Sequence, residues 1–231
     1  GSMLGMVLAG VLMRFSSQLP FYLAAGVAAS IAVVLARSSH QKHPARSSSL
    51  GSNFGTLAES AWDQAQRRAA LTSIFMAYLV IGGVTTQFPK LATQLGYGTT
   101  LIGLTMGVLP LLRTIGFAAF DRSKAASSIS SPLILVKVLL AMAMAMLVIA
   151  DSSVIFMLAF ALLGLTSAAT FSFSQYLCLK NPAQAGRRIG FHESSMLGGI
   201  VLGSILSGLL AQSFGVRFAF SFGILLSILA L

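Results

Sequence analysis

The side chains that could do chemistry in this sequence are few, because charged residues are rare within its long apolar segments. Arg113 is the clearest case, since it lies about eight residues, or about 12 Å, from the nearer end of its apolar run. A charge at that depth is costly to bury and by default indicates a functional site, here one that binds a substrate. Two other interpretations stay open for Arg113: pairing with Asp121 two turns further on, and snorkelling toward the polar end of its segment. Lys137 lies only about one and a half turns into its own run, where snorkelling is expected.

His192 and Glu193 form a second group, at the expected start of an apolar segment that covers residues 194–213. A carboxylate in the first turn of a helix is stabilised by the helix dipole, which requires no functional role. The alternative is a proton-linked gate, because a carboxylate and an imidazole can both exchange a proton with their surroundings.

Polar and aromatic side chains also gather within two apolar segments. Tyr78 and the glycine pair Gly82-Gly83 lie near the middle of residues 69–87, where the glycines either weaken the helix or allow close helix packing. Thr170 and Phe171 belong to a polar and aromatic stretch near the end of the segment 154–177. That density is high for lipid contact, so we expect one face of this segment to line a cavity and to bind the substrate.

Enzyme chemistry has no support in the sequence. His40, His43 and His192 lack the spacing of a metal site, and no glycine-rich loop precedes a Lys-Ser or Lys-Thr pair. No nucleophile elbow is present, and Cys178 is the single cysteine, so an intramolecular disulfide is impossible. We therefore expect no catalytic residues, no metal and no cofactor.

Composition identifies the setting of these residues. Of the 231 residues, 56% are hydrophobic and only 9% are charged, whereas soluble domains carry about 25% charged residues. The chain is therefore predicted to be an all-α, polytopic membrane helical bundle in contact with the lipid bilayer. Its net charge of +10 is attributed to cytoplasmic loops, which collect Lys and Arg, and not to a nucleic-acid partner.

About eight transmembrane helices are predicted, because a helix needs about 20 residues to cross the hydrocarbon layer. The expected spans are residues 3–15, 20–36, 69–87, 101–120, 132–150, 154–177, 194–213 and 216–231. The first and the last are short, which suggests a chain cut at both ends.

The long polar segment 37–68 divides two of these spans from the other six. Its second part, with Ser60 and Asp63 in a capping-box pattern, is expected to start a helix that leads into the next span. Counting Lys and Arg loop by loop places this segment and the turns after 120 and 177 on one side of the membrane. That side is predicted to be the cytoplasm, which places both termini there as well.

Two stretches have similar glycine patterns: residues 4–10 contain Leu-Gly, Leu and Gly at the same spacing as residues 202–208. They lie six spans apart, and a parallel repeat of six spans is a known transporter architecture. The sequence from Gly116 to Lys124, GFAAFDRSK, is similar to the cytoplasmic Gly…Asp-Arg signature of one such family. Its spacing is one residue longer, and Ser replaces the glycine that usually follows Asp-Arg.

On these features, and on the stretch GRRIGFHE that leads into the seventh span, the chain resembles a transporter of the major facilitator superfamily. The resemblance implies that residues 1–36 are the last two helices of an N-terminal half, that 37–68 is the basic cytoplasmic loop between halves, and that 69–231 is a six-helix C-terminal half. The first four helices of the family pattern would be missing. Asp121 and Arg122 would form a charge cluster that acts in gating.

The expected function is secondary active transport of a small-molecule solute by alternating access, with proton-coupled efflux as one option. The alternative is a fragment of a transporter that has a structural role and no transport of its own. Substrate binding is assigned to Arg113, Tyr78, Thr170 and Phe171. Gating or proton coupling is assigned to Asp121, Arg122, Glu193 and His192. Nothing in the sequence sets the oligomeric state.

Overall fold

The computed structural model describes residues 61–122, 131–180 and 184–229, together with Leu12, Tyr22, Leu23, Ala25, Gly26 and Ser30. At 61, 121–122, 131–133 and 229 it describes the backbone only. The two spans expected at 3–15 and 20–36, and most of the loop at 37–68, therefore lie almost wholly outside the described residues. The prediction of about eight helices is tested only for the last six.

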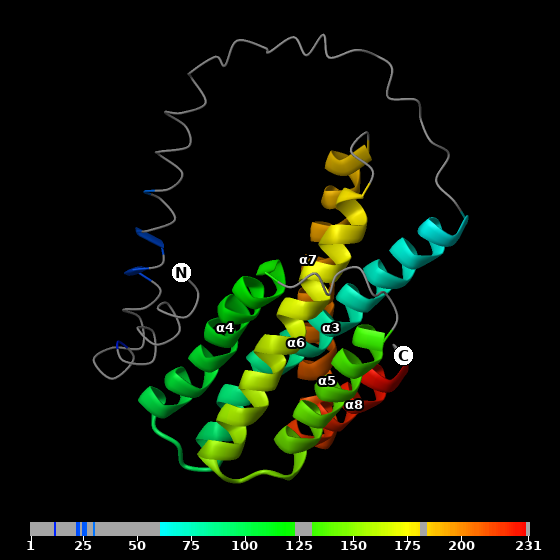
Figure 1. Cartoon of the computed structure of the whole chain (residues 1–231). Coiled ribbons are helices and arrows are strands. Elements are labelled where there is room, and N and C mark those ends of the chain that lie inside the picture. The colour runs from blue at the N-terminus through cyan, green and yellow to red at the C-terminus, as the bar shows by residue number, and fades with distance from the viewer. Residues whose placement is uncertain are drawn as a thin grey trace.

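Six helices make up residues 61–229, and the described residues contain no strand (Figure 1). Their bounds are α3 Ala61–Gln94, α4 Thr99–Arg122, α5 Ser131–Ile149, α6 Ser153–Leu179, α7 Ala185–Phe214 and α8 Val216–Leu229. Each helix matches one of the predicted spans: α3, α4, α6 and α7 contain theirs, whereas the spans 132–150 and 216–231 extend one and two residues past the ends of α5 and α8. This confirms an all-helical architecture for the described part of the chain. α3 begins well before the expected span, as the capping pattern at Asp63 predicted.

Four stretches are long and apolar enough to cross a membrane: Trp62–Gln94, Thr99–Phe120, Ser153–Leu179 and Ala185–Phe214. The apolar parts of α5 and α8, Ile134–Ile149 and Val216–Ile228, are shorter. A helix rises 1.5 Å per residue, so the four long ones exceed the roughly 30 Å thickness of the hydrocarbon layer.

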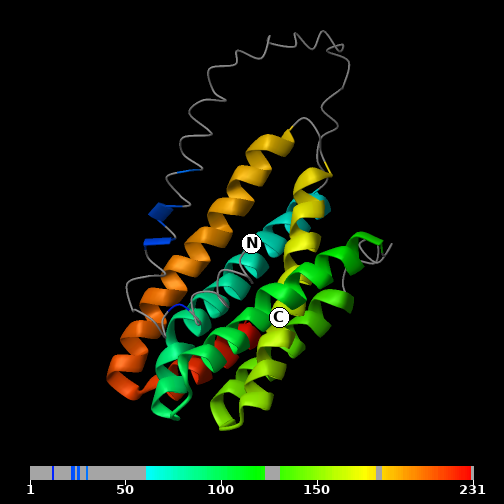
Figure 2. The ribbon, with the colours of Figure 1, turned by 90° about the vertical axis from the view of Figure 1, so that its left-hand side faces the viewer.

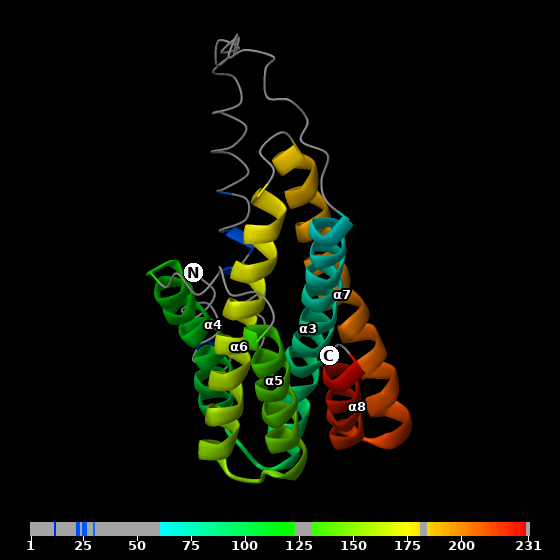
Figure 3. The same ribbon diagram turned by 45° about the vertical axis from the view of Figure 1, so that its right-hand side comes forward.

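Two pairs of helices form the most extensive contacts, α3 with α7 and α4 with α6. Figures 2 and 3 show α7 running alongside α3. α5 packs between α6 and α8, whereas α3 and α4 touch each other only slightly. Consecutive helices therefore do not form the main pairs, and the bundle consists of two tight pairs that meet along a seam, with α5 and α8 beside them.

Glycine residues bring α3 and α7 into backbone contact. A Cβ atom added at Gly199 would lie 2.5 Å from the carbonyl oxygen of Phe75, and one at Gly203 would overlap the backbone of Leu79. A Cβ at Gly82 would likewise overlap the backbone of Ile200. α3 is continuous through Gly82, so close packing, and not a local break in the helix, explains the glycine pair there.

The second pair is built in the same way. A Cβ atom at Gly164 of α6 would lie 2.5 Å from the carbonyl oxygen of Leu109 and 3.1 Å from the backbone nitrogen of Arg113. A Cβ at Gly116 of α4 would lie 2.7 Å from the Cβ of Ala168. The backbone of α4 around Arg113 is therefore fixed directly against α6.

A set of three residues, called here the turn clasp, ties the connections at one end of the bundle. Arg217 donates hydrogen bonds to the carbonyl oxygens of Val148 (3.0 Å) and Ala150 (3.3 Å), and it pairs with the carboxylate of Asp151. The Tyr97 hydroxyl donates to the carbonyl oxygen of Asp151. Tyr97, Asp151 and Arg217 thus connect the turns α3–α4, α5–α6 and α7–α8.

The opposite end is basic. The described residues there include Arg67, Arg68, Lys180, Arg187 and Arg188. Lys180, the C-terminal cap residue of α6, pairs with Asp63 of α3 at 2.5 Å, and both side chains are partly exposed. The alternation of the helices therefore brings to one end the turns that were predicted to share a side of the membrane.

Candidate functional site

Arg113 lies at the seam between the two helix pairs, with aromatic rings around its guanidinium group. Its Cζ atom is 5.1 Å from the centroid of the Tyr78 ring, 5.3 Å from that of Phe117 and 5.5 Å from that of Phe171. All three distances are within the roughly 6 Å over which a cation is attracted to an aromatic face. Tyr78 comes from α3, Phe117 from α4 and Phe171 from α6, and we call these three rings with Arg113 the aromatic–arginine site.

The polar atoms of this site are not satisfied within the described part of the protein. Arg113 Nε is buried and has no hydrogen-bond partner, and the structure gives the guanidinium no ion pair with a described carboxylate. The Tyr78 hydroxyl is also buried without a partner, on a residue that is only 1% exposed. Buried polar groups in native proteins nearly always have a partner, so two such atoms on contacting residues make this region the candidate for binding a molecule that supplies acceptors.

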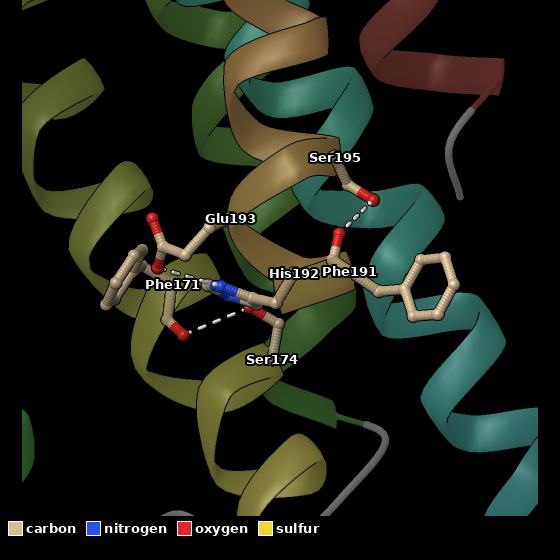
Figure 4. A network of polar contacts seen from close by, with 6 residues as sticks. All are labelled: Phe171, Ser174, Phe191, His192, Glu193 and Ser195. Atoms are coloured by element: carbon tan, nitrogen blue, oxygen red, sulfur yellow. Dashed lines mark hydrogen bonds and ion pairs between the residues drawn. The ribbon is translucent and has the colours of Figure 1, made fainter. Parts of the chain in front are cut away.

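A second polar group adjoins the site and is drawn in Figure 4. His192 is fully buried, and its Nε2 atom is 2.8 Å from the Ser174 hydroxyl while its Nδ1 atom is 3.3 Å from Glu193 Oε1. The His192 ring meets the Phe171 ring edge to face at 4.9 Å. The Glu193 side chain is 40% exposed. We call Ser174, His192 and Glu193 the histidine chain, which runs from the core to a solvent-accessible carboxylate.

The two groups are neighbours. Phe171 contacts both the guanidinium of Arg113 and the ring of His192. The Tyr78 phenol is in electrostatic range of both Arg113 and Glu193. Five of the residues singled out from the sequence, on four different helices, are therefore brought to one region.

The helix-dipole explanation of Glu193 is wrong. α7 begins at Ala185, nine residues before the expected start of the span, so His192 and Glu193 lie about two turns inside the helix. A carboxylate at that position gains little from the dipole, whose effect is confined to the first turn. The position of Glu193 beside His192 needs another reason.

Of the three other predicted residues, only Thr170 has a described side chain. The Thr170 hydroxyl donates to the Thr166 carbonyl oxygen at 2.9 Å, so it is satisfied within α6 and buried. Asp121 and Arg122 are the last residues of α4, at the basic end, and their side chains lie outside the described part of the structure.

Two residues of the cluster were missed by sequence reasoning. Phe117 follows Arg113 by four residues, and that spacing puts two side chains on the same face of a helix, so it could have been found. Ser174 lies three residues after Phe171 and was not distinguished from the other hydroxyl residues nearby. Whether Ser174 faces His192 depends on the rotation of α6 relative to α7, and the local sequence does not determine that rotation.

Lys137 does not snorkel. Its side chain is only 3% exposed, and Nζ donates to the carbonyl oxygen of Ser73 on α3 at 3.4 Å. The Ser73 hydroxyl is buried and has no partner in the ranges that the structure describes. A buried ammonium group with one long hydrogen bond to a carbonyl oxygen is a poorly compensated charge.

Replacing Lys137 with Met should therefore stabilise the protein, by about 1–3 kcal/mol, because it removes a buried charge and keeps the side-chain length. Thermal unfolding in detergent measures this effect. Lys90 is exposed and provides the matched control, since Lys90→Met removes the same charge without relieving burial. A lower unfolding temperature for Lys137→Met than for wild type would show that the ammonium group has a partner that stabilises the fold.

A small cavity between α3, α7 and α8 does not serve as a solute site. It has a volume of about 20 Å³ and is lined by apolar side chains, glycines and Ser207, which is room for about one water molecule. Arg113 does not line it. The aromatic–arginine site, and not this cavity, is the candidate for binding a solute.

The fold and the site together define a class: a polytopic, all-helical membrane protein with a charged and aromatic cluster between its helices. The family model of the Major Facilitator Superfamily matches residues 1–186 of the chain. The chain therefore belongs to the major facilitator superfamily, as the resemblance in its motifs predicted. No curated protein and no solved structure matches it. Members of this family are membrane transporters rather than enzymes, which makes the chain an integral membrane protein of a solute-transport class.

Proposed function

We propose that this chain moves a small solute across the membrane by alternating access, with the aromatic–arginine site as the place where the solute binds. The observation that carries this proposal is that buried Arg113 Nε has no acceptor among the described residues. A charge held between membrane-crossing helices without a described partner is expensive, and a function that requires it is the simplest reason for its presence. The seam between the two helix pairs also provides a boundary along which the site could open.

We further propose that His192 and Glu193 couple transport to protons. The Ser174 hydroxyl carries one hydrogen, and when it donates to the Phe171 carbonyl oxygen at 3.0 Å it accepts from His192 Nε2. A hydrogen bond between Nδ1 and Glu193 then requires a second proton on the pair. If the Ser174 hydroxyl rotates and donates to Nε2, the pair needs one proton fewer. The His192–Glu193 pair can therefore hold either one or two protons without movement of its heavy atoms, as a proton carrier must.

We propose the organisation of the whole chain from the pattern of its family. Residues 69–231 would form one six-helix half, residues 1–36 two helices of the other half, and residues 37–68 the basic cytoplasmic loop between them. The basic end of the bundle would face the cytoplasm, because cytoplasmic loops are enriched in Lys and Arg. Asp121 and Arg122 would act in gating at that end, and Thr170 would contribute from α6.

Uptake by the full chain reconstituted in liposomes tests this function. Solutes are screened with and without an imposed proton gradient, and wild type should show flux that depends on the gradient. Absence of flux for every solute would mean that the chain does not transport alone.

Glu193→Gln should abolish the stimulation by the proton gradient and leave solute exchange at equal pH on both sides, because the amide cannot release a proton. Gradient-driven uptake and solute exchange, measured side by side in the same liposomes, check this. Asp63→Asn is the matched control, since it neutralises a partly exposed carboxylate at the basic end, far along α3 from Tyr78. Glu193→Gln that still responds to the gradient would remove Glu193 from the coupling.

A further inference from the structure

We propose that the solute bound at the aromatic–arginine site is an organic monoanion, held through a carboxylate by the Arg113 guanidinium and the Tyr78 hydroxyl. This inference rests on the proposed transport function and adds the chemical class of the solute. It is carried by three features of the site: its unpaired donors, its charge and its apolar walls.

The unpaired atoms at the site can both donate hydrogen bonds. Arg113 offers only N–H groups, and Nε–H is buried without an acceptor in the described part of the protein. The Tyr78 hydroxyl is likewise buried with no partner among the described residues, and the guanidinium lies 5.1 Å from the centroid of the Tyr78 ring. Aromatic faces stabilise a positive charge but offer no lone pairs in the guanidinium plane. A carboxylate has two oxygens with about four lone-pair positions, so one group can accept from both residues at once.

The charge of the site favours an anion over a cation. Arg113 already occupies the faces of Tyr78, Phe117 and Phe171, the positions at which a cationic solute would bind. One guanidinium group balances one negative charge. Glu193 lies 3.3 Å from His192, whose ring contacts Phe171 of the site, and its carboxylate would repel a second negative charge. A monoanion therefore fits better than a dianion such as phosphate.

The apolar walls of the site indicate that the solute has a hydrocarbon part. Phe117 and Phe171 are half-buried, so their rings keep accessible apolar surface next to the guanidinium group. Their own rings meet edge to face at 5.4 Å. A solute that places its carboxylate on Arg113 would bring its hydrocarbon part against these rings, which adds the burial of apolar surface to the ion pair.

Thermal unfolding of the full chain in detergent micelles tests the class of ligand without requiring transport, because a ligand that binds the folded state raises the unfolding temperature. The probes are two matched series, benzoate with benzamide and benzylammonium, and hexanoate with hexanamide and hexylammonium, together with inorganic phosphate. We expect the carboxylates to raise the unfolding temperature of wild type, and the amides, ammonium ions and phosphate to leave it unchanged.

Substitutions test which residues bind the carboxylate. Arg113→Gln should weaken carboxylate binding by about 100-fold and Tyr78→Phe by about tenfold, in line with loss of charge-assisted hydrogen bonds. Arg113→Lys keeps the charge and should retain a preference for carboxylates at lower affinity, which also covers the case that the Gln variant fails to fold. Arg187→Gln is the matched control, because Arg187 lies over the exposed Phe191 ring at 5.8 Å and outside the site.

Stabilisation by the ammonium ions, or by phosphate more than by any carboxylate, would overturn the assignment. So would carboxylates that stabilise wild type and Arg113→Gln equally, or that stabilise neither. Flux in liposomes separates this inference from the proposed function. Carboxylate binding that depends on Arg113, without flux of any solute, would leave the ligand class standing and refute transport by this chain. Flux of a cationic solute without carboxylate binding would support transport by this chain and refute the assignment of an organic monoanion as its solute.

Discussion

Arg113→Gln is expected to abolish transport, with a loss of at least about 100-fold in uptake, while the folded protein is as stable as wild type or more stable. The loss follows because charge-assisted hydrogen bonds to a bound solute contribute about 1.5–3 kcal/mol each, and about 2.7 kcal/mol corresponds to 100-fold. The stability follows because Arg113 Nε is buried with no partner among the described residues, so removing the group leaves no described acceptor unpaired. Uptake in liposomes and thermal unfolding of the same preparation measure the two quantities.

Arg187→Gln again serves as the control for loss of one arginine that lies over an aromatic ring. A marked fall in the unfolding temperature of Arg113→Gln, with a matching fall in the amount of folded protein, would assign Arg113 to the fold. Uptake at the wild-type rate would remove Arg113 from the solute site altogether.

Gly203→Ala is the second large effect expected, this time on the fold. The added methyl group would overlap the backbone of Leu79 on α3, and a backbone cannot move aside as a flexible side chain can. Forcing α3 and α7 apart should cost about 3 kcal/mol, at the upper end of the usual cost of overpacking. Thermal unfolding in detergent and the yield of monodisperse protein report the change.

Gly198→Ala is the matched control on the same helix. A Cβ atom at Gly198 would have as its nearest neighbour a ring carbon of Phe75 at 3.9 Å, an ordinary contact. This variant should therefore be tolerated. Equal unfolding temperatures for Gly198→Ala and Gly203→Ala would contradict the close contact between α3 and α7.

The positions of the helices could be read from the sequence wherever a long apolar run ended at a turn. The bounds of α4, α5 and α6 differ from the expected spans by at most two residues at either end. The start of α7 was misplaced because its first turns, Ala185 to Glu193, are polar and basic, so they do not register as a membrane span although they are helical. Hydropathy detects the part of a helix that lies in lipid and not its extension beyond it.

The membership of the site was only partly predictable. Arg113 could be identified because a single charged residue within an apolar segment is evident from the sequence, whatever the rotation of the helix. Which rings surround it depends on how α3, α4 and α6 are rotated about their axes, and that rotation is set by tertiary packing at glycines such as Gly164. Lys137 was misjudged for the same reason, since its burial depends on its contact with Ser73 on a helix distant in sequence.

The turn clasp has a consequence for how the bundle could open. Arg217, Asp151 and Tyr97 hold three inter-helix turns together at one end. If α3 and α7 tilt against α4 and α6, the pivot lies at that end, and separation grows with distance along the helices. Arg113 is about 21 Å along α4 from Thr99, the first residue after the clasped turn. A small rotation at the clasp would therefore be amplified into a larger displacement at the aromatic–arginine site, and the helices would separate most at the basic end.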